Sequence, residues 1–202
     1  MINIENLTKK FGEKILFRNL NIKIENGEFI AFSGPSGSGK TTLLNMIGGI
    51  ETIDEGEIIV DGINVHDKKS QLLYFRKKVG FIFQNFALID NKTVKDNLEI
   101  VRKDSRNDLS IESALSIVGL ENKLKEKVYM LSGGEQQRVA LARIMLKQTS
   151  LILADEPTGS LDEKNAEIVM SILENFNKQG KTIILVTHDE RIKTRAKRVI
   201  EL

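Results

Sequence analysis

The chain has 202 residues, enough to bury a sizeable hydrophobic core in one large domain. Its 30 lysine and arginine residues nearly balance its 28 aspartate and glutamate residues, and the net charge of +2 therefore implies no strong basic field and no nucleic-acid partner. Because cysteine is absent, a disulfide framework and a zinc-thiolate site are both excluded.

The first part of the chain alternates between apolar and polar residues, which is the period of a β-strand with one buried face. Four isoleucines fall on one face of this pattern: Ile2, Ile4, Ile22 and Ile24. The dipeptide Asn26-Gly27 separates two such strands, and Asp61-Gly62 is a strong signal for a tight hairpin further along. This part of the sequence therefore predicts a hairpin-rich β layer.

Residues 33–49, "SGPSGSGKTTLLNMIGG", fit G-x-x-x-x-G-K-[ST] between an apolar strand and a helical pattern. Glycines let successive backbone N–H groups point at phosphate oxygens, and the following helix aims its positive end at the same place. We expect Lys40 to reach the β and γ phosphates and Thr41 to ligate Mg²⁺. The predicted nucleotide-binding residues of this loop are Gly34, Pro35, Ser36, Gly37, Ser38, Gly39, Lys40, Thr41 and Thr42.

The middle of the chain changes from strand to helix. "VGFIFQ", residues 79–84, is typical of a buried strand, and after it apolar residues recur at helical spacing. Those residues include Val94, Leu98, Val101, Leu115 and Val118. We therefore predict a helical subdomain over about residues 85–146, within one domain that spans residues 1–202.

Two continuous apolar runs in the last third, "LILADEP" and "TIILVTHDE", are typical of parallel strands that are buried on both faces. Between them, "EKNAEIVMSILENFNKQG" is an amphipathic helix that ends at Gly180. A strand, a helix and a second strand in this order predict an α/β fold with its functional groups at the carboxyl ends of the strands.

The first of these strands ends in two consecutive carboxylates, whose side chains point to opposite sides of extended backbone. We expect Asp155 to hold the magnesium ion, directly or through water. Glu156 can then orient and deprotonate the attacking water, as a general base whose pKa is raised by burial and by its neighbour.

The segment "LSGGEQQR", residues 131–138, resembles the signature sequence of ATP-binding cassette (ABC) proteins over all eight residues. Ser132, Gly133, Gly134 and Glu135 begin a helix and offer a second helix N-terminus to a phosphate. The resemblance implies a P-loop NTPase of ABC type. Such a fold has a mainly parallel core sheet, an antiparallel β subdomain and an inserted α-helical subdomain.

Further residues resemble family motifs in the expected order. Phe11 is similar to the aromatic residue that stacks on adenine, although an isolated phenylalanine is more often a core residue. Gln84 resembles the glutamine that senses Mg²⁺ and the γ-phosphate, and Asp162 resembles part of the loop that crosses the dimer interface. His188 resembles the switch histidine that contacts the γ-phosphate, although a histidine at a strand end is often structural.

The resemblance implies a Mg²⁺-dependent ATPase that acts as a homodimer in its ATP-bound state and energises a separate integral membrane permease. Catalytic roles would fall to Glu156, His188, Gln84 and Lys40, and metal ligation to Thr41, Gln84 and Asp155. Within the family the chain is most similar to cassettes of the lipoprotein-release, macrolide-efflux and bacteriocin-export type. We expect the permease to contact the face near residues 86–91, including Leu88 and Ile89.

No apolar run reaches the ~18 residues that span a bilayer, and the expected location is cytoplasmic, peripheral on the inner face of the cell membrane. A chromosome-maintenance ATPase would need a long coiled coil before the signature, and a nucleotide kinase would have no use for "LSGGEQQR". One alternative stays open, in which the cassette drives a membrane protein in signalling, cell-wall control or resistance and not in transport.

Overall fold

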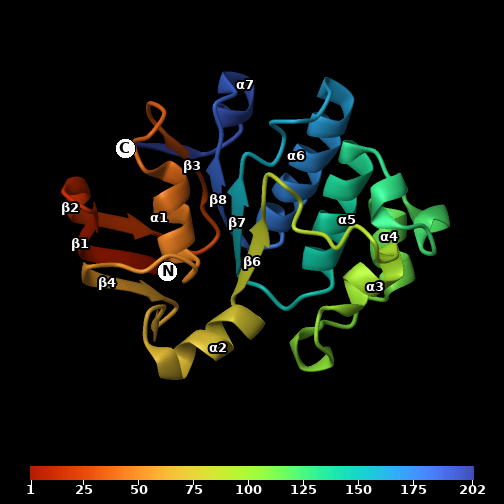
Figure 1. Cartoon of the computed structure of the whole chain (residues 1–202), viewed down its shortest axis with the longest axis horizontal. Coiled ribbons are helices and arrows are strands. Elements are labelled where there is room, and N and C mark those ends of the chain that lie inside the picture. Colours follow the sequence, from red (N-terminus) through yellow and green to blue (C-terminus); the bar gives the residue numbers. More distant parts are fainter.

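The computed structural model describes residues 1–202 and contains two sheets that form separate layers (Figure 1). The antiparallel sheet has the order β2-β1-β4-β5 and the parallel sheet has the order β6-β7-β8-β3-β9. The strands are β1 (Ile2–Phe11), β2 (Lys14–Ile24), β3 (Phe29–Ser33), β4 (Glu55–Val60), β5 (Ile63–Asn64), β6 (Val79–Ile82), β7 (Leu151–Asp155), β8 (Thr182–Val186) and β9 (Arg198–Glu201).

Helices lie between the two sheets, below them and on the far side of the parallel sheet (Figure 1). They are α1 (Lys40–Ile47), α2 (Lys68–Lys77), α3 (Val94–Glu99), α4 (Ile111–Ile117), α5 (Gly133–Met145), α6 (Glu163–Lys178) and α7 (Glu190–Lys193). Three short 3₁₀ helices span Lys103–Ser105, Glu121–Lys123 and Val128–Met130. None of the helices is both long and apolar enough to cross a bilayer.

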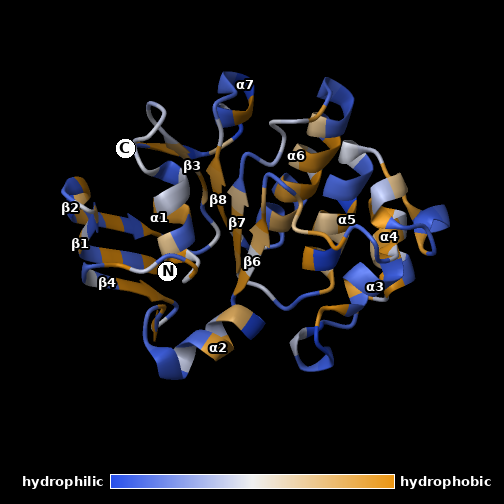
Figure 2. Cartoon of the chain, viewed as in Figure 1, coloured by the Kyte–Doolittle hydropathy of each residue, from blue (hydrophilic) through white to orange (hydrophobic).

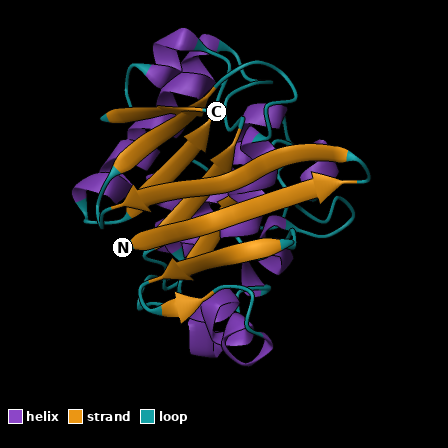
Figure 3. Ribbon diagram, turned by 90° about the vertical axis from the view of Figure 1, so that its left-hand side faces the viewer, coloured by secondary structure: helices purple, strands orange, loops and turns teal.

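The antiparallel sheet confirms the period-two alternation of the sequence. Ile2 pairs with Ile24 and Ile4 pairs with Ile22, and all four side chains are buried. The predicted hairpin at Asp61-Gly62 joins β4 to β5. Figure 3 shows this sheet from its outer side, with the parallel sheet and most helices behind it.

The parallel sheet separates the hydrophobic core into two parts, because successive side chains of its strands point to opposite faces. Along β7, Leu151 and Leu153 face the cluster around α1, whereas Ile152 and Ala154 face the cluster around α5 and α6. Both faces of the sheet are thus apolar, as its continuous apolar strands predict, and Figure 2 shows hydrophobic residues gathered along it.

The segment between β6 and β7 contains only helical elements, in agreement with the apolar spacing of the sequence. All of the apolar residues that define this spacing are buried in the cluster around α5 and α6: Val94, Leu98, Val101, Leu115 and Val118. Gly180 adopts a positive φ of 88° just beyond α6, where the sequence predicts the end of that helix.

Candidate functional site

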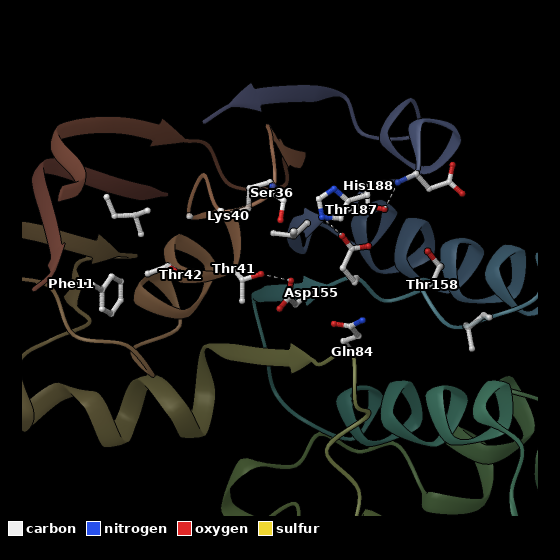
Figure 4. A pocket seen from close by; sticks show the side chains of 18 of the residues that line it. Phe11, Ser36, Lys40, Thr41, Thr42, Gln84, Asp155, Thr158, Thr187 and His188 are labelled. Carbon is white, nitrogen blue, oxygen red and sulfur yellow. Dashed lines mark hydrogen bonds and ion pairs between the residues drawn. The ribbon is translucent and has the colours of Figure 1, made fainter. Parts of the chain in front are cut away.

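A cleft of about 860 Å³ opens at the carboxyl ends of the parallel strands, the expected place for a ligand in an α/β sheet (Figure 4). The strands β3, β6, β7 and β8 each continue into a loop that contributes to it. Its walls are formed by Phe11, Lys14, Leu16, Ser36, Gly37, Gly39, Lys40, Thr41, Thr42, Gln84, Asp155, Glu156, Thr158, Gly159, Leu161, Val186, Thr187, His188 and Asp189.

The phosphate loop takes a backbone conformation that requires glycine. Gly39 precedes α1 with a φ of 100°, and a Cβ atom there would lie 2.5 Å from Phe17 Cζ and 2.9 Å from Leu16 Cδ2. Both the left-handed conformation and the lack of space therefore exclude a side chain. Gly34 has a φ of 141° and passes close to the carbonyl oxygen of Leu202.

Lys40 is buried at the start of α1, and its ammonium lies within the phosphate loop. Nζ donates to the carbonyl oxygens of Gly34 at 2.9 Å and Pro35 at 2.8 Å. The cation is thus held at the centre of the loop, beside the N-terminus of α1, where the helix dipole also favours an anion.

Two of the three predicted metal ligands contact each other across the cleft. Thr41 Oγ1 donates to Asp155 Oδ1 at 3.0 Å, although the two residues lie 114 positions apart in the sequence. Burial raises the pKa of Asp155, while the hydrogen bond from Thr41 and the charges of His188 and Lys40 oppose the shift. The pair supplies a hydroxyl and a carboxylate, which are hard oxygen ligands of the kind that Mg²⁺ prefers.

Glu156 is held in a strained conformation directly after β7. Its φ of 46° is left-handed, and its Oε1 atom is buried without a hydrogen-bond donor. His188 Nε2 lies 3.4 Å from that oxygen, within ion-pair distance. Burial raises the pKa of Glu156; His188 opposes this shift, and the neighbouring charge of Asp155 adds to it.

Other predicted residues lie on the walls of the same cleft. Gln84 follows β6 and is exposed beside Asp155, and Phe11 ends β1 beyond the phosphate loop with 49% of its surface exposed (Figure 4). Phe11 is therefore a wall residue of the cleft and is not buried in the core.

The signature residues do not line this cleft. Ser132 caps α5 through its side chain, which accepts from Glu135 N at 3.3 Å, while Glu135 Oε2 accepts from Ser132 N at 2.8 Å. Asp162 likewise lies outside the cleft and caps α6, accepting from Asn165 N at 2.8 Å. The predicted residues thus form two groups, one around the phosphate loop and one at two capped helix ends.

A buried contact connects the signature helix to the loop that follows Glu156. Gln137, which is fully buried in α5, donates through Nε2 to the carbonyl oxygen of Pro157 at 2.7 Å. Gly134 packs against α6 so closely that a Cβ atom there would lie 2.5 Å from Asn165 Cγ. The helix α5 is therefore joined by a buried hydrogen bond to the backbone next to Glu156.

Several wall residues of the cleft were not predicted from the sequence. Among them are Lys14, Thr158, Gly159, Thr187 and Asp189. Thr187 and Asp189 flank His188 directly after a buried strand, so position alone gave a usable signal for them. Lys14 and Leu16 lie in the hairpin between β1 and β2, and no sequence pattern connects that hairpin to the phosphate loop.

The raised pKa of Glu156 predicts a pH-dependent gain in stability for Glu156→Gln. A carboxyl with a higher pKa in the folded chain binds more protons when folded, so the free energy of unfolding falls as pH rises through that pKa. Without nucleotide, we expect Glu156→Gln to raise Tm by ~1 to 3 °C at about pH 8 and to change it little at about pH 4. The exposed Glu13→Gln is the control, and equal shifts in both variants at both pH values would contradict the prediction.

A profile of the ABC transporter family matches residues 17–159. The chain is 43% identical over 211 residues to the macrolide export ATP-binding/permease protein MacB of Campylobacter jejuni, which covers all of this chain but 33% of the MacB sequence. It is 40% identical over 219 residues to the ABC transporter ATP-binding protein MJ0796 of Methanocaldococcus jannaschii, covering all of this chain and 93% of MJ0796.

A solved dimeric structure of the MJ0796 cassette in a post-hydrolysis state, bound to ADP and Pi, superposes with a TM-score of 0.86. The two sequences are 38% identical there, over all of this chain and 94% of the other. The predicted ABC-type fold and the predicted similarity to macrolide-efflux cassettes are thereby confirmed. The chain is an ATP-binding cassette and belongs to the ABC transporter family.

Proposed function

We propose that the chain hydrolyses ATP with Mg²⁺ and uses this reaction to energise export or extraction of a substrate through a separate membrane protein. The observation that carries the proposal is a single cleft in which Lys40, the Thr41–Asp155 pair and Glu156 converge. Phosphate binding, metal ligation and activation of water are then available in one place.

The residues of the cleft fit a magnesium ion. The chain has no group of three or more His, Cys, Asp or Glu side chains that could hold a metal ion by protein ligands alone. Mg²⁺ needs no such group, because it keeps several waters and takes one or two protein oxygens together with substrate phosphates. Thr41, Asp155 and Gln84 would hold it, and the bound ion would neutralise charge on the phosphates.

The roles of the remaining side chains follow from their contacts. Lys40 supplies a positive charge at the centre of the phosphate loop, and the N-terminus of α1 adds its dipole. Glu156 has a buried oxygen with no donor, which can accept a hydrogen bond from a water molecule and then its proton. His188 lies opposite this oxygen, where it can contact the terminal phosphate.

We infer that two copies of the chain pair head to tail around two nucleotides. The capped end of α5, with Ser132 and Gly133, lies outside the cleft, so it is free to contact the nucleotide of a second copy. A twofold arrangement would give each nucleotide a phosphate loop from one chain and a signature helix from the other. The dimeric structures of the MJ0796 cassette support this inference.

In this proposal residues 1–202 form one nucleotide-binding domain, and residues 85–146 are its helical subdomain. The domain would lie on the cytoplasmic face of a membrane through its partner. The MacB relatives are named as combined ATP-binding and permease proteins, and this chain spans 33% of their length.

The expected permease surface at residues 86–91 exposes only part of its apolar surface. Leu88 is partly buried against the hydrophobic cluster around α5 and α6, which reduces the area it could offer to a partner. The backbone at Phe86 and Ala87 is held against α5, because both carbonyl oxygens accept hydrogen bonds from the guanidinium of Arg143. Ile89, at 46% exposed, is the only large apolar side chain of this segment that is largely exposed.

An adjacent groove of about 390 Å³ fits a partner helix better. It lies between α2, β6 and the segment after α3, and the exposed side chains of Leu72 and Ile100 border it. Its apolar walls are Leu72, Phe75, Phe81, Phe83, Ile100, Val101 and Ile144. We propose that an amphipathic cytoplasmic helix of the membrane protein lies in this groove.

The charged residues of the groove indicate which charge the partner helix should carry. Four cations line it or border it, namely Arg76, Arg102, Arg143 and Lys147. One carboxylate, Asp104, pairs with Arg76 at 3.6 Å and Arg102 at 3.4 Å, so positive charge is in excess. Burial, helped by Arg143, lowers the pKa of Lys147 to about 8. The partner helix should therefore carry acidic residues beside its apolar face.

We predict that Glu156→Gln removes most of the Mg²⁺-dependent ATPase activity while ATP binding is preserved. Loss of a general base lowers rates on the order of 10² to 10⁴-fold, whereas the amide keeps the shape of the site. The variant should accumulate as an ATP-bound dimer in size-exclusion chromatography. Turnover close to that of the unmodified chain would remove Glu156 from this role.

A second prediction separates the two groups of site residues. Lys40→Ala should weaken ATP binding to the monomer by on the order of ten-fold or more, because it deletes a charge inside the phosphate loop. Ser132→Arg should leave monomer binding nearly unchanged and abolish ATP-dependent dimerisation, as measured by calorimetric titration and light scattering. Loss of monomer binding in Ser132→Arg would contradict the shared site.

A third prediction concerns the groove. Leu72→Glu and Ile100→Glu should abolish copurification with a coexpressed membrane protein and its effect on turnover, while basal ATPase activity stays unchanged. Ile117→Glu on α4 is the matched control, because Ile117 is as exposed (54%) as Leu72 (57%) and Ile100 (51%). If all three variants copurify equally well, the partner docks elsewhere.

A further inference from the structure

A buried lysine lies beneath the aromatic ring at the edge of the nucleotide cleft. Lys9 is 4% exposed, and its Nζ atom lies 4.8 Å from the centroid of the Phe11 ring. Phe11 itself is half exposed and forms part of the cleft wall. One side of the ring thus contacts a cation from within the protein, while much of the ring remains open to a ligand.

An irregularity of β1 turns this lysine inward. Leu7, Thr8 and Lys9 are all buried, although regular alternation would expose one of every two residues. The pairing of β1 with β2 shifts register between Ile4 and Leu7, where the buried positions change from even to odd, and again on either side of Lys9. Bulges of this kind redirect a side chain locally, and here they place a charged residue in the interior.

The ammonium is fixed by contacts with the segment that follows α1. Nζ donates to Glu51 Oε1 at 2.7 Å and to the carbonyl oxygen of Thr52 at 2.9 Å. This segment is joined to α1, since the N–H groups of Ile50 and Glu51 both donate to Asn45 O. Lys9 therefore connects the Phe11 ring with the helix whose other end carries the phosphate loop.

We propose that Lys9 is a positioning residue for the nucleotide base. A cation near the face of a ring attracts it electrostatically, which restricts the rotation of a side chain that is otherwise exposed. The same cation draws electron density toward itself, so the opposite side of the ring becomes a better surface for an electron-rich purine. This inference rests on the proposed function, the binding of ATP in this cleft, and on the resemblance of Phe11 to the aromatic residue that stacks on adenine.

A purely structural role makes different predictions. If Lys9 serves only to neutralise Glu51 and close the end of α1, its loss would lower stability without discriminating between ligands that have a base and ligands that lack one. If Lys9 acts through the ring, its loss affects only ligands that stack, and only while a ring is present at position 11. Inorganic tripolyphosphate supplies the ligand without a base.

The first arm of the test establishes stacking. The chain has no tryptophan, so Phe11→Trp introduces a single fluorescent reporter at the cleft. Addition of ATP should change its emission, and addition of tripolyphosphate should change it much less. If ATP binds by calorimetry but leaves the emission unaltered, the stacking role of position 11 is wrong, which overturns this inference but leaves phosphate binding and hydrolysis intact.

The second arm measures how much Lys9 contributes to the affinity for each ligand. Lys9→Met should weaken ATP binding about 3- to 10-fold, within the range of a cation–π contact, and change tripolyphosphate binding less than about two-fold. Glu51→Gln keeps the ammonium of Lys9 and removes only the negative charge of its partner, so ATP affinity should change less than about two-fold. Lys9→Gln gives the same comparison as Lys9→Met if the methionine variant is unstable, with Tm of each variant as the check on folding.

A double-mutant cycle completes the test. In the Phe11→Ala background, Lys9→Met should cause no further loss of ATP affinity, because the ring through which Lys9 acts is gone. An equal loss in both backgrounds, an equal loss for ATP and tripolyphosphate, or unchanged ATP affinity in Lys9→Met would each overturn the inference. None of these three results bears on the roles of Lys40 or Glu156.

Discussion

The burial of α1 between the two sheets is the constraint on which the rest of the structure depends. Four of its side chains, Leu43, Leu44, Met46 and Ile47, are at most 1% exposed and pack against apolar residues from both sheets. A helix held on two sides cannot shift without opening the core, because protein interiors are close-packed. Its N-terminus, and with it the phosphate loop, is therefore fixed. The crowding at Gly39 follows from the same packing, since Leu16 and Phe17 come from the antiparallel sheet.

The strand order β6-β7-β8-β3 then brings distant parts of the chain to this fixed point. Parallel strands end at the same edge of a sheet, so the residues after β6, β7 and β8 meet the loop after β3. The hydrogen bond between Thr41 and Asp155 is one result of this order. The helical segment between β6 and β7 does not contribute its signature to the same cleft, since Ser132 begins α5 and none of residues 131–138 lines the cleft. Topology thus explains why the site is divided between two places.

Much of this arrangement could be predicted from the sequence, because it depends on local signals. A period or motif in the sequence matches the structure in three places: the isoleucines of β1 and β2, the phosphate loop and the crossover helix α6. The exceptions arise where contacts with residues distant in sequence determine which side chains are buried. Lys9 is turned inward by a bulge that interrupts the period of its strand, and Leu88 is drawn into the core of a helical segment that follows it in sequence. Neither event leaves a local pattern.

Glu156 shows how this framework maintains a conformation that is unfavourable by itself. Left-handed backbone in a non-glycine residue costs on the order of 1 kcal/mol or more, and a buried carboxylate oxygen without a donor adds a desolvation penalty. The buried strand β7 fixes the residue from one side, and the hydrogen bond from Gln137 to Pro157 fixes the loop from the other. Glu156 Oε1 has no donor and could accept a proton from water, so the same unsatisfied oxygen that lowers stability suits Glu156 to its proposed role as general base. Because Gln137 lies on the signature helix, a second copy of the chain that binds there can influence the geometry of this carboxylate through one buried hydrogen bond.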